Sequence, residues 1–420
     1  MSSRFEIAVV GGGAAGLAAA IAAAREGRSV VVADRMPRLG KKILITGGGR
    51  CNLSNERLPA EAYTSTNPAL VSSVLTRFGP GEIVRFFEGL GLLMTSDEGR
   101  LYPATNQAAS VLKVLEIEIR RLGVSVVADF EAAGFVRKGT SYTVQAADGR
   151  TIEASAVVLA GGGRSYPALG SNGSAYELAR KLGHRLIDPV PSCVPLLVRD
   201  RLCQVLQGQR LRARAAAWID DRSAVDAEGD ILFASYGLSG TAILDISTAL
   251  SAARHRDGKT NTKISVDFLP RMTREALTKE LVDRLRRRWE PADLISGLLP
   301  EKFAAIVTGM IPGGLRSAEE TAGALTSTLK DRRFDVHGTR GWNEAEFTSG
   351  GVDAGEIETE RLESKFNPGL HFAGEILDVQ GPRGGFNLAW AWASGILAGR
   401  AAAAVSQAFP KTMAKRAIRT

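Results

Sequence analysis

The feature that most constrains this chain is a glycine-rich turn near its N-terminus. An apolar run, Glu6–Val10, is typical of a buried parallel strand and leads directly into Gly11-Gly-Gly-Ala-Ala-Gly16 and a helix predicted at Leu17–Arg25. The first glycine allows the tight turn, Gly13 lets the backbone approach a pyrophosphate, and Gly16 lets the helix pack closely on the strand. Because the start of a helix offers free N–H groups and a positive dipole end, this turn predicts a phosphate site.

An acidic residue at the end of the next predicted strand completes the pattern. Gly27 closes the helix, Ser29–Ala33 is a second strand candidate, and Asp34 follows that strand. At about twenty residues after the turn, a carboxylate can accept both ribose hydroxyls of an adenosine. The same carboxylate disfavours a 2′-phosphate, so the motif favours FAD or NAD over NADP.

Length and composition favour a globular protein of more than one domain. The 420 residues exceed the ~100–150 of one ordinary core, and 45% hydrophobic with 23% charged residues excludes a wholly disordered chain. Three irregularly spaced cysteines, Cys51, Cys193 and Cys203, argue against a disulfide framework and against a zinc site, so no metal is expected. Glycines interrupt the apolar residues 7–24, and we predict a cytoplasmic protein without a signal peptide or a membrane span.

Two later segments decide between FAD and NAD. Ala154–Ala160 is a strand candidate that ends at Gly161-Gly-Gly163, and Gly369–Glu375 is an apolar strand followed by a glycine and an acid. Gly384-Gly-Phe-Asn387 then leads into a helix predicted at Leu388–Ala403. Two-domain FAD enzymes place such an acid on the ribityl chain and aim the next helix N-terminus at the flavin. Each segment alone also fits an ordinary loop or helix start, but together with the first motif they predict FAD.

Residues 38–55 form a long and specific segment, Arg38-Leu-Gly-Lys-Lys-Ile-Leu-Ile-Thr-Gly-Gly-Gly-Arg-Cys-Asn-Leu-Ser-Asn55. It resembles the signature of the bacterial BaiN-like flavoproteins, also called the aminoacetone-oxidase-like family, which includes ribosomal RNA dihydrouridine synthases. Other members are described as amine oxidases or bile acid reductases. Further matching segments are Gly161–Gly173, Pro191–Pro195, Phe347–Val352, Phe372–Asp378 and Trp390–Trp392.

The resemblance implies an α/β fold and a domain arrangement. The fold is a Rossmann-like FAD-binding domain of the two-dinucleotide, glutathione-reductase-like type, split by an inserted β-rich domain and a small helical domain. We place the FAD-binding domain at residues 1–195 and 343–410, the β-rich domain at 196–270 and 311–342, the helical domain at 271–310, and a basic tail at 411–420. The middle of the chain contains strand candidates, a turn and a helix at Leu196–Val198, Ala215–Trp218, Ile231–Phe233, Ile264–Phe268, Gly237–Gly240 and Arg274–Arg288.

The motifs and the resemblance together give a set of site residues. We expect the cofactor to be held by Gly11, Gly13, Ala14, Ala15, Gly16, Asp34, Arg35, Lys41, Lys42, Thr46, Gly47, Gly49, Arg50, Cys51, Asn52, Ala160, Gly161, Gly162, Gly374, Glu375, Gly384, Gly385, Phe386 and Asn387. The candidates for substrate contact are Tyr102, Asn106 and Arg383. Arg383 lies where this sequence departs from the family pattern, and a solvent-facing loop arginine explains it equally well.

Cys51 is the candidate for chemistry by a side chain. A flavin supplies hydride chemistry itself, but reducing a carbon–carbon double bond also needs a proton. Lys41, Lys42 and Arg50 could lower the pKa of this thiol and make it a general acid. The alternative is a small buried residue that packs against the cofactor.

Basic residues gather in the middle of the chain. Arg210, Arg212, Arg214 and the run Arg284–Arg288 contribute to a formal net charge of +8, and some of them could bind phosphates of a nucleic acid. The run is flanked by Asp283 and Glu290, so a solvated helix face explains it as well.

Three functions follow from these features. The first is an FAD-dependent oxidoreductase that reduces an unsaturated substrate with electrons from NAD(P)H, with a uridine of 23S ribosomal RNA favoured as substrate. NAD(P)H would visit transiently, because no second Gly-x-Gly-x-x-Gly motif provides a domain for it. The second is a small-molecule oxidase or reductase acting on an amine or an enone. The third is a flavin-bearing nucleic-acid-binding module without turnover.

Overall fold

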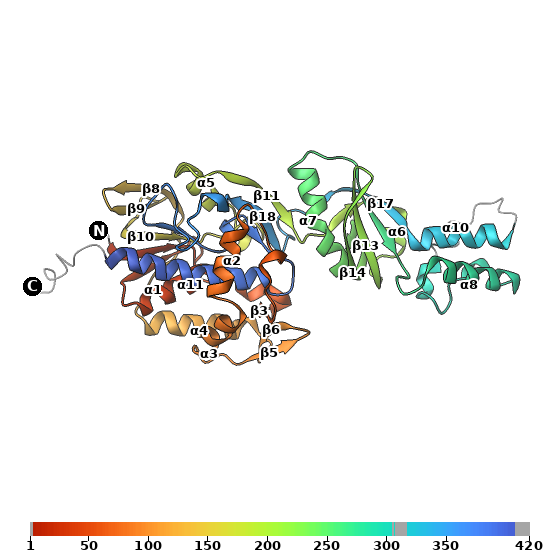
Figure 1. Cartoon of the computed structure of the whole chain (residues 1–420), viewed down its shortest axis with the longest axis horizontal. Coiled ribbons are helices and arrows are strands. Elements are labelled where there is room, and N and C mark those ends of the chain that lie inside the picture. Colours follow the sequence, from red (N-terminus) through yellow and green to blue (C-terminus); the bar gives the residue numbers. More distant parts are fainter. Residues whose placement is uncertain (1–2, 305, 307–316, 408–420) are drawn as a thin grey trace, which may run out of the picture. The chain divides into compact units, whose positions relative to one another are not determined.

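A computed structural model describes residues 3–304, 306 and 317–407, and its chain divides into two compact units (Figure 1). The first unit is Met1–Pro189 with Phe347–Thr420, and the second is Val190–Glu346. The first boundary, after Pro189, lies six residues before the one that we placed after residue 195. The second, after Glu346, lies four residues beyond the one that we placed after residue 342. The basic tail predicted at 411–420 lies outside the described residues.

The first unit is built on a seven-stranded sheet in the order β7-β2-β1-β10-β9-β8, with β19 also paired to β10. Strands β7, β2, β1, β10 and β19 run parallel, whereas β9 is antiparallel to both β10 and β8. The strands are β1 (Ser3–Val10), β2 (Val30–Ala33), β7 (Ser125–Val127), β8 (Ala132–Lys138), β9 (Ser141–Ala146), β10 (Thr151–Leu159) and β19 (Leu370–Phe372).

The register of this sheet brings the predicted motifs to one edge. Val10 is opposite both Leu159 and Ala33, and Leu159 is opposite Phe372. The residues that follow these four strands therefore leave the sheet side by side at its carboxyl edge. This strand order and direction confirm the fold class predicted from the sequence. In open parallel sheets ligands bind at the carboxyl edge, so this edge is the expected location of the site.

Two apolar helices pack against each other beside the sheet. In the close contact between α1 (Ala14–Arg25) and α11 (Phe386–Gln407), glycines of α11 lie against backbone carbonyls of α1 (Figure 1). A Cβ atom on Gly395 would lie 2.3 Å from the carbonyl oxygen of Ala15, and one on Gly399 would lie 2.2 Å from that of Ala19. Only glycine allows backbones to approach so closely.

The helix α11 is unusually apolar for its length. Phe386–Val405 is long and apolar enough to cross a membrane, with a mean hydropathy of 1.3, whereas we expected no such segment. However, 72% of its apolar window is buried inside the protein, and Trp390 and Trp392 are fully covered. Among the described residues this is the one helix long and apolar enough to cross a membrane, and it is buried as a core helix is.

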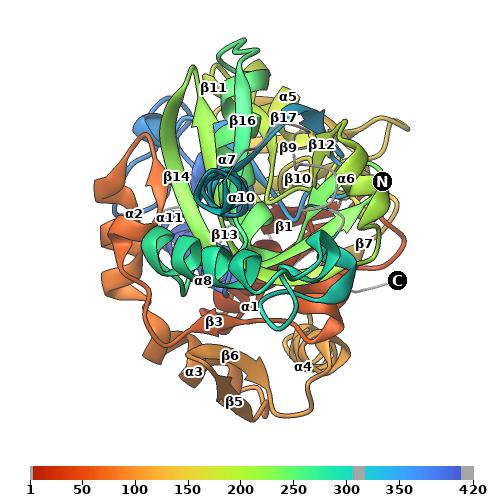
Figure 2. The ribbon, with the colours of Figure 1, turned by 90° about the vertical axis from the view of Figure 1, so that its right-hand side faces the viewer.

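Smaller elements complete the first unit. The other helices are α2 (Pro68–Arg77), α3 (Pro80–Glu88), α4 (Ala108–Arg121) and α5 (Ser174–Lys181). Three small sheets pair β3 (Ser54–Asn55) and β5 (Met94–Asp97) with β6 (Arg100–Pro103), β4 (Thr64–Ser65) with β20 (Val379–Gln380), and β11 (Leu186–Ser192) with β18 (Phe347–Val352). The hairpin β5–β6 and the short strand β3 lie near α3 (Figure 2).

The second unit contains a closed barrel in the order β12-β15-β14-β13-β16-β17. Along β13, Ala213, Ala215 and Ala217 are buried in the barrel core, whereas Arg210, Arg212 and Arg214 on the opposite face are exposed. The strands are β12 (Leu196–Val198), β13 (Arg210–Ile219), β14 (Arg222–Ala234), β15 (Gly237–Ser239), β16 (Thr262–Asp267) and β17 (Arg332–Thr339). The helices are α6 (Arg201–Val205), α7 (Thr241–His255), α8 (Arg274–Arg286) and α10 (Ala318–Lys330).

Two features of this unit differ from our expectations. The turn expected at Gly237–Gly240 is mostly the strand β15, because Gly237 lies so close to β12 that a Cβ would be 2.4 Å from the carbonyl oxygen of Leu196. The helical part also extends beyond residue 310: α10 packs on α8, where the hydroxyls of Thr278 and Thr326 are 3.0 Å apart.

Candidate functional site

The turn between β1 and α1 has the geometry of a phosphate site. Gly11 has φ +108, and a Cβ there would lie 2.3 Å from the carbonyl oxygen of Ala160, while one on Gly16 would lie 1.7 Å from that of Gly11. A Cβ on Gly13, in contrast, would meet no described atom within 4 Å. The helix has no side-chain cap and no acid in its first turn, so the first N–H groups of α1, at Ala14 and Ala15, face open space beside Gly13.

Asp34 lies at the carboxyl end of β2, next to this turn. Its Oδ2 accepts a hydrogen bond from the N–H of Gly12 (2.5 Å) and its Oδ1 accepts one from the N–H of Met36 (2.7 Å). Burial raises the pKa of this carboxyl group, although the two backbone donors act in the opposite direction. Each carboxylate oxygen keeps a lone pair, so the fixed side chain can still accept ribose hydroxyls.

The segments after β10 and β19 come to the same place. Ala160 contacts Gly11 as described above, and the space beside Gly161 is filled by the side chain of Ala175. Gly374, with φ +79, lies so close to α1 that a Cβ would be 2.7 Å from that of Ala15. The glycine positions that the sequence singled out thus surround the start of α1 in three dimensions.

A partly buried ion pair joins the signature segment to the residues that follow β19. The ammonium of Lys42 donates to Oε2 of Glu375 (2.8 Å) and to the hydroxyl of Ser165 (2.6 Å). The other oxygen of Glu375 accepts from the N–H of Thr348 (2.8 Å) and from Ser165 (3.2 Å). Burial alone would raise the pKa of Glu375, but Lys42 and these donors outweigh it, so its pKa is lowered. We expected Glu375 to bind the ribityl chain of the flavin. In the structure its carboxylate binds the ammonium of Lys42.

The end of the signature segment packs on the start of α11. In the amide orientation that satisfies its neighbours, Asn52 donates to the carbonyl oxygens of Ser54 and Leu101 and accepts from the N–H of Gly385 (3.1 Å). Asn55 donates to the carbonyl oxygen of Gly384 (3.0 Å). Gly384 and Gly385 have φ +112 and +99, and this backbone leaves the N-terminus of α11 beside the signature segment.

Arg50 meets both residues predicted to touch substrate outside the FAD motifs. Its guanidinium lies 4.1 Å from the ring centroid of Tyr102, and its Nε donates to Oδ1 of Asn106 (3.2 Å). Its Nη2 pairs with Asp97 (3.3 Å). Gly47 lies near the same ring, because a Cβ there would be 3.7 Å from Cε1 of Tyr102.

The environment of Cys51 corrects the expectation for its thiol. The residue is fully buried, and burial raises its pKa to about 12 although a hydrogen bond with Thr46 opposes the change. The expected lowering of the pKa by neighbouring cations is wrong, because Lys42 turns to Glu375 and Arg50 turns to Tyr102 and Asp97. The thiol is therefore protonated at neutral pH.

Several predicted site residues have other partners. Arg35 pairs with Glu131 (3.3 Å), and the hydroxyl of Thr46 donates to the carbonyl oxygen of Ile43 (2.7 Å). Asn387 closes its own turn by bonding both backbone groups of Gly381 (2.9 Å each). The remaining members of the set, which lie half-buried or exposed in the same loops, are Lys41, Gly49, Gly162, Arg383 and Phe386.

Sequence reasoning missed the residues that hold this site from behind. Ser165 and Thr348 fix Glu375, and Asp97 fixes Arg50. The indole N–H groups of Trp390 and Trp392 donate to the carbonyl oxygens of Gly374 (3.2 Å) and Leu53 (3.1 Å). Ser165, Thr348 and the two tryptophans lie in the segments Gly161–Gly173, Phe347–Val352 and Trp390–Trp392 that carried the family resemblance, so a signal was present for all of these residues except Asp97.

Comparison with known proteins decides the family. A family model described as the HI0933-like protein Rossmann domain matches residues 5–401. The chain belongs to this HI0933-like family. It is 37% identical over 94% of its length to the 3-dehydro-bile acid delta(4,6)-reductase of Clostridium scindens, of which 98% is covered. It is 30% identical over 93% of its length to the ribosomal RNA dihydrouridine synthase of Escherichia coli, of which 96% is covered.

The solved structures agree with the fold. A flavocytochrome c3 fumarate reductase, 18% identical, covers 96% of this HI0933-like protein with a TM-score of 0.51, and 79% of that chain is covered. The protein is an FAD-dependent oxidoreductase. Its residues fit the cofactor, because open space lies at Gly13 before an uncapped helix and a fixed carboxylate at Asp34 lies beside it.

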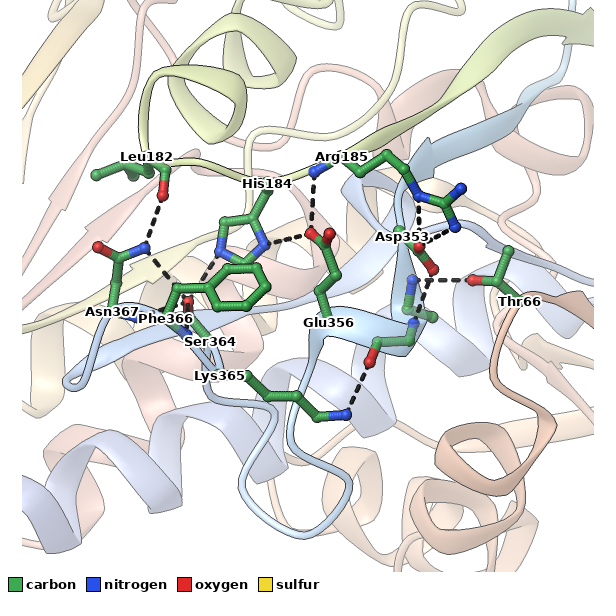
Figure 3. Close-up of polar contacts among 12 residues, drawn as sticks. Thr66, Leu182, His184, Arg185, Asp353, Glu356, Ser364, Lys365, Phe366 and Asn367 are labelled. Atoms are coloured by element: carbon green, nitrogen blue, oxygen red, sulfur yellow. Dashed lines mark hydrogen bonds and ion pairs between the residues drawn. The ribbon is translucent and has the colours of Figure 1, made fainter.

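A second polar cluster of the first unit lies around His184 (Figure 3). Its Nδ1 is 3.1 Å from Oε2 of Glu356, and its Nε2 is 2.8 Å from Oγ of Ser364. Ser364 Oγ accepts from the N–H groups of Phe366 (3.1 Å) and Asn367 (2.9 Å), so its own hydrogen points to Nε2. The hydroxyl of the buried Ser364 therefore has hydrogen-bond partners for both its hydrogen and its oxygen. These contacts connect the loop after β18 to the turn before β11.

We expect this cluster to make stability depend on pH. Burial lowers the pKa of His184, although Glu356 opposes the change. The unfolded chain therefore binds more protons near pH 6.5, the ordinary pKa of histidine, and stability present above that pH falls as the pH drops through it. Buried His371 acts with the same sign. Urea unfolding at pH 8 and pH 5, followed by circular dichroism, measures the loss.

Two histidine variants test whether His184 causes this loss of stability at low pH. His184→Gln is expected to show a smaller difference between the two pH values than the unchanged protein, whereas His255→Gln, at an exposed position on α7, is expected to keep the full difference. Equal pH dependence in His184→Gln and the unchanged protein would refute this assignment.

Proposed function

We propose that this protein reduces a carbon–carbon double bond conjugated to a carbonyl group, with electrons that pass from NAD(P)H through FAD. The observation that carries the proposal is the chemistry shared by two relatives matched over nearly their whole length. A delta(4,6)-reductase of a 3-dehydro-bile acid, by its name, saturates bonds conjugated to a ketone. Dihydrouridine synthesis saturates the C5–C6 bond of uracil, which is conjugated to the C4 carbonyl.

The arrangement of the chain supports a transient electron donor. After β10, the backbone N–H of Arg164 is taken by the hydroxyl of Thr348 (2.8 Å), and the next helix, α5, begins only at Ser174. No second glycine turn leads directly into a helix there, in the part of the chain that the structure describes. FAD would supply the hydride chemistry; Gly13 would hold its phosphates, Asp34 its adenosine ribose, and the start of α11 would stabilise the negative charge of its reduced ring.

Cys51 is proposed as the proton donor for the second step. Burial raises the pKa of Cys51 to about 12, so the thiol carries its proton at neutral pH, and the same high pKa makes it a weak acid. Cys51→Ala is expected to keep FAD and to reduce its substrate at least ~100-fold more slowly, measured by the reoxidation of prereduced flavin. Cys51→Ser, which replaces the thiol by a hydroxyl of similar size, is the matched control. An unchanged rate in Cys51→Ala would leave the thiol a packing role only.

The charges of the second unit favour a small substrate over ribosomal RNA. On the barrel, Arg210, Arg212 and Arg214 of β13 face Asp230, Glu228 and Asp226 of β14, at 3.6, 3.4 and 3.1 Å. Residues 190–346 contain 23 Lys and Arg and 21 Asp and Glu. The arginine row that we considered for phosphate binding therefore forms a ladder of ion pairs with little charge left over.

Two of the other basic residues named in this region are also engaged. Arg284 is buried and donates to the carbonyl oxygens of Leu294 (3.0 Å) and Ser296 (2.8 Å), while Arg286 pairs with Glu319 (2.7 Å). Uridine in 23S ribosomal RNA remains the second candidate because of the relative named for that reaction and because residues 408–420 contain four Lys or Arg and no acid.

The two substrates are separated by a direct measurement. We expect the purified protein with NADPH to reduce a 4-en-3-one steroid at a rate that changes little between 50 and 300 mM salt. A ribosomal RNA substrate would lose rate steeply over that range, because phosphate contacts release counterions. The dihydrouridine content of ribosomal RNA, with and without the gene, gives the same answer in the cell. If deletion of the gene removes a dihydrouridine and the intact gene restores it, the substrate is ribosomal RNA and not a small molecule.

A further inference from the structure

Arg50 is a partly exposed residue whose guanidinium has three partners. Tyr102 lies beneath its guanidinium, Asn106 accepts from Nε, and Asp97 accepts from Nη2. Tyr102 is buried, and Asn106 has φ +53, a conformation that costs energy for a residue other than glycine. The side chain of Arg50 nevertheless remains 43% exposed. It is therefore held in one orientation while part of it faces outward.

Stability does not explain this arrangement. An exposed ion pair such as that with Asp97 contributes only about 0–1 kcal/mol. The guanidinium has five N–H donors, and the contacts with Asn106 and Asp97 use two of them. One face of its plane lies on Tyr102, so the opposite face and the remaining donors are available to a ligand.

The position of Arg50 connects it to the flavin site. Asn52, two residues further on, accepts from the N–H of Gly385 at the start of α11. The backbone N–H of Arg50 donates to the carbonyl oxygen of Gly47 (3.3 Å), within the exposed glycines Gly47–Gly49. The held guanidinium therefore belongs to the same loop that contacts the helix N-terminus assigned to the reduced ring.

We propose that Arg50 binds the carbonyl oxygen of the substrate and polarises the conjugated double bond. The inference rests on the function proposed above and names the group that recognises the substrate. A hydride supplied by bound, reduced FAD would add to the β carbon, the electron pair of the double bond would move onto the oxygen as an enolate, and the proton donor proposed above, Cys51, would then protonate the α carbon. Arg50 stabilises the negative oxygen in this step, as a fixed donor in an oxyanion site does. Tyr102, Asn106 and Asp97 are its positioning residues.

The recognised chemistry is a planar carbonyl conjugated to a double bond. A 3-keto group of an enone and the C4 carbonyl of uracil both present it, and the planar substrate can also stack on the free face of the guanidinium. The two sources are distinguished by the acceptor used in the experiment: a 4-en-3-one steroid in one arm and an unmodified large-subunit ribosomal RNA transcript in the other.

The experiment separates the two half-reactions of the flavin in Arg50→Met and Arg50→Lys. Arg50→Met is expected to bind FAD normally and to be reduced by NADPH at the unchanged rate. Its prereduced flavin is expected to be reoxidised by the conjugated carbonyl ~100-fold more slowly, and by ferricyanide, which needs no carbonyl activation, at the unchanged rate. Arg50→Lys keeps the charge without the planar fork and is expected to recover part of the rate.

A matched control and the contrary outcomes complete the test. Arg57→Met removes an exposed arginine from the same segment and is expected to change neither half-reaction. Loss of FAD from Arg50→Met would make Arg50 a cofactor ligand and overturn the proposal. If an acceptor that the unchanged protein reduces also reoxidises the flavin of Arg50→Met at the same rate, that result would overturn the role of Arg50 and leave the proposed function standing. An unchanged protein that reduces neither acceptor would overturn the proposed function and the role of Arg50 together.

Discussion

Replacing Gly13 by aspartate is expected to yield a folded protein that has lost FAD. The backbone of Gly13, with φ −82, suits any residue, and a Cβ there meets no described atom within 4 Å. Aspartate is also a slightly better N-cap than glycine, by roughly a few tenths of a kcal/mol, in a helix that has no side-chain cap. Its carboxylate, however, would occupy the start of α1, where we propose that the pyrophosphate binds, and the like charges would repel. We expect FAD affinity to fall at least ~100-fold, or ~2.7 kcal/mol.

Gly13→Asn is the control for this prediction. It has the same shape as Gly13→Asp and is a similar cap, but it lacks the charge. Titration of the apoprotein with FAD, followed by quenching of flavin fluorescence, gives both affinities, and thermal unfolding of the two apoproteins checks the fold. If Gly13→Asp binds FAD as tightly as Gly13→Asn, the phosphates do not bind at this turn.

The second large effect is expected at the contact between α1 and α11. A Cβ on Gly395 would lie 2.3 Å from the carbonyl oxygen of Ala15, so Gly395→Ala forces the two helices apart. The buried core residues on both helices then lose packing, and we expect the free energy of unfolding to fall by about 2–3 kcal/mol or more. Chemical denaturation of the apoprotein measures it, because FAD binding is then not part of the result.

Gly323→Ala provides a control of opposite sign. Gly323 also lies inside a helix, α10, but a Cβ there meets no described atom within 4 Å. Alanine is the better helix former, so this variant is expected to gain about 0.8–1.0 kcal/mol. Destabilisation of similar size in both variants would mean that close approach to Ala15 is not the cause.

The parts of the fold that the sequence predicts are those set by local chemistry. Glycines at the end of a strand, as at Gly11 and Gly374, are required by the backbone at that point, and the apolar run Leu196–Val198 coincides with β12. Gly237 shows the limit of this reasoning. Glycine is typical of turns, but here it permits the close approach of β12, a partner forty residues away in the chain.

The chemistry of the site is less predictable because it depends on distant partners. Lys42 and Arg50 are near Cys51 in sequence, which suggested a lowered pKa, but Glu375 and Asp97 bind them elsewhere. The His184 cluster likewise joins residues more than 170 positions apart. Spacing along the chain does not reveal such pairs. The glycine motifs needed no distant partner to be recognised, and for that reason they identified the cofactor.

The split sheet has a consequence for how the protein is made. Strand β1 and helix α1 are synthesised first, but β19 and α11, which complete the sheet and cover α1, come more than 340 residues later. At translation rates of about 5–20 residues per second, the apolar face of α1 waits roughly 20–80 seconds for its partner. The barrel, whose strands are contiguous from Leu196 to Thr339, can fold on the ribosome during that wait. The apolar face of the nascent α1 therefore stays uncovered until α11 has been synthesised.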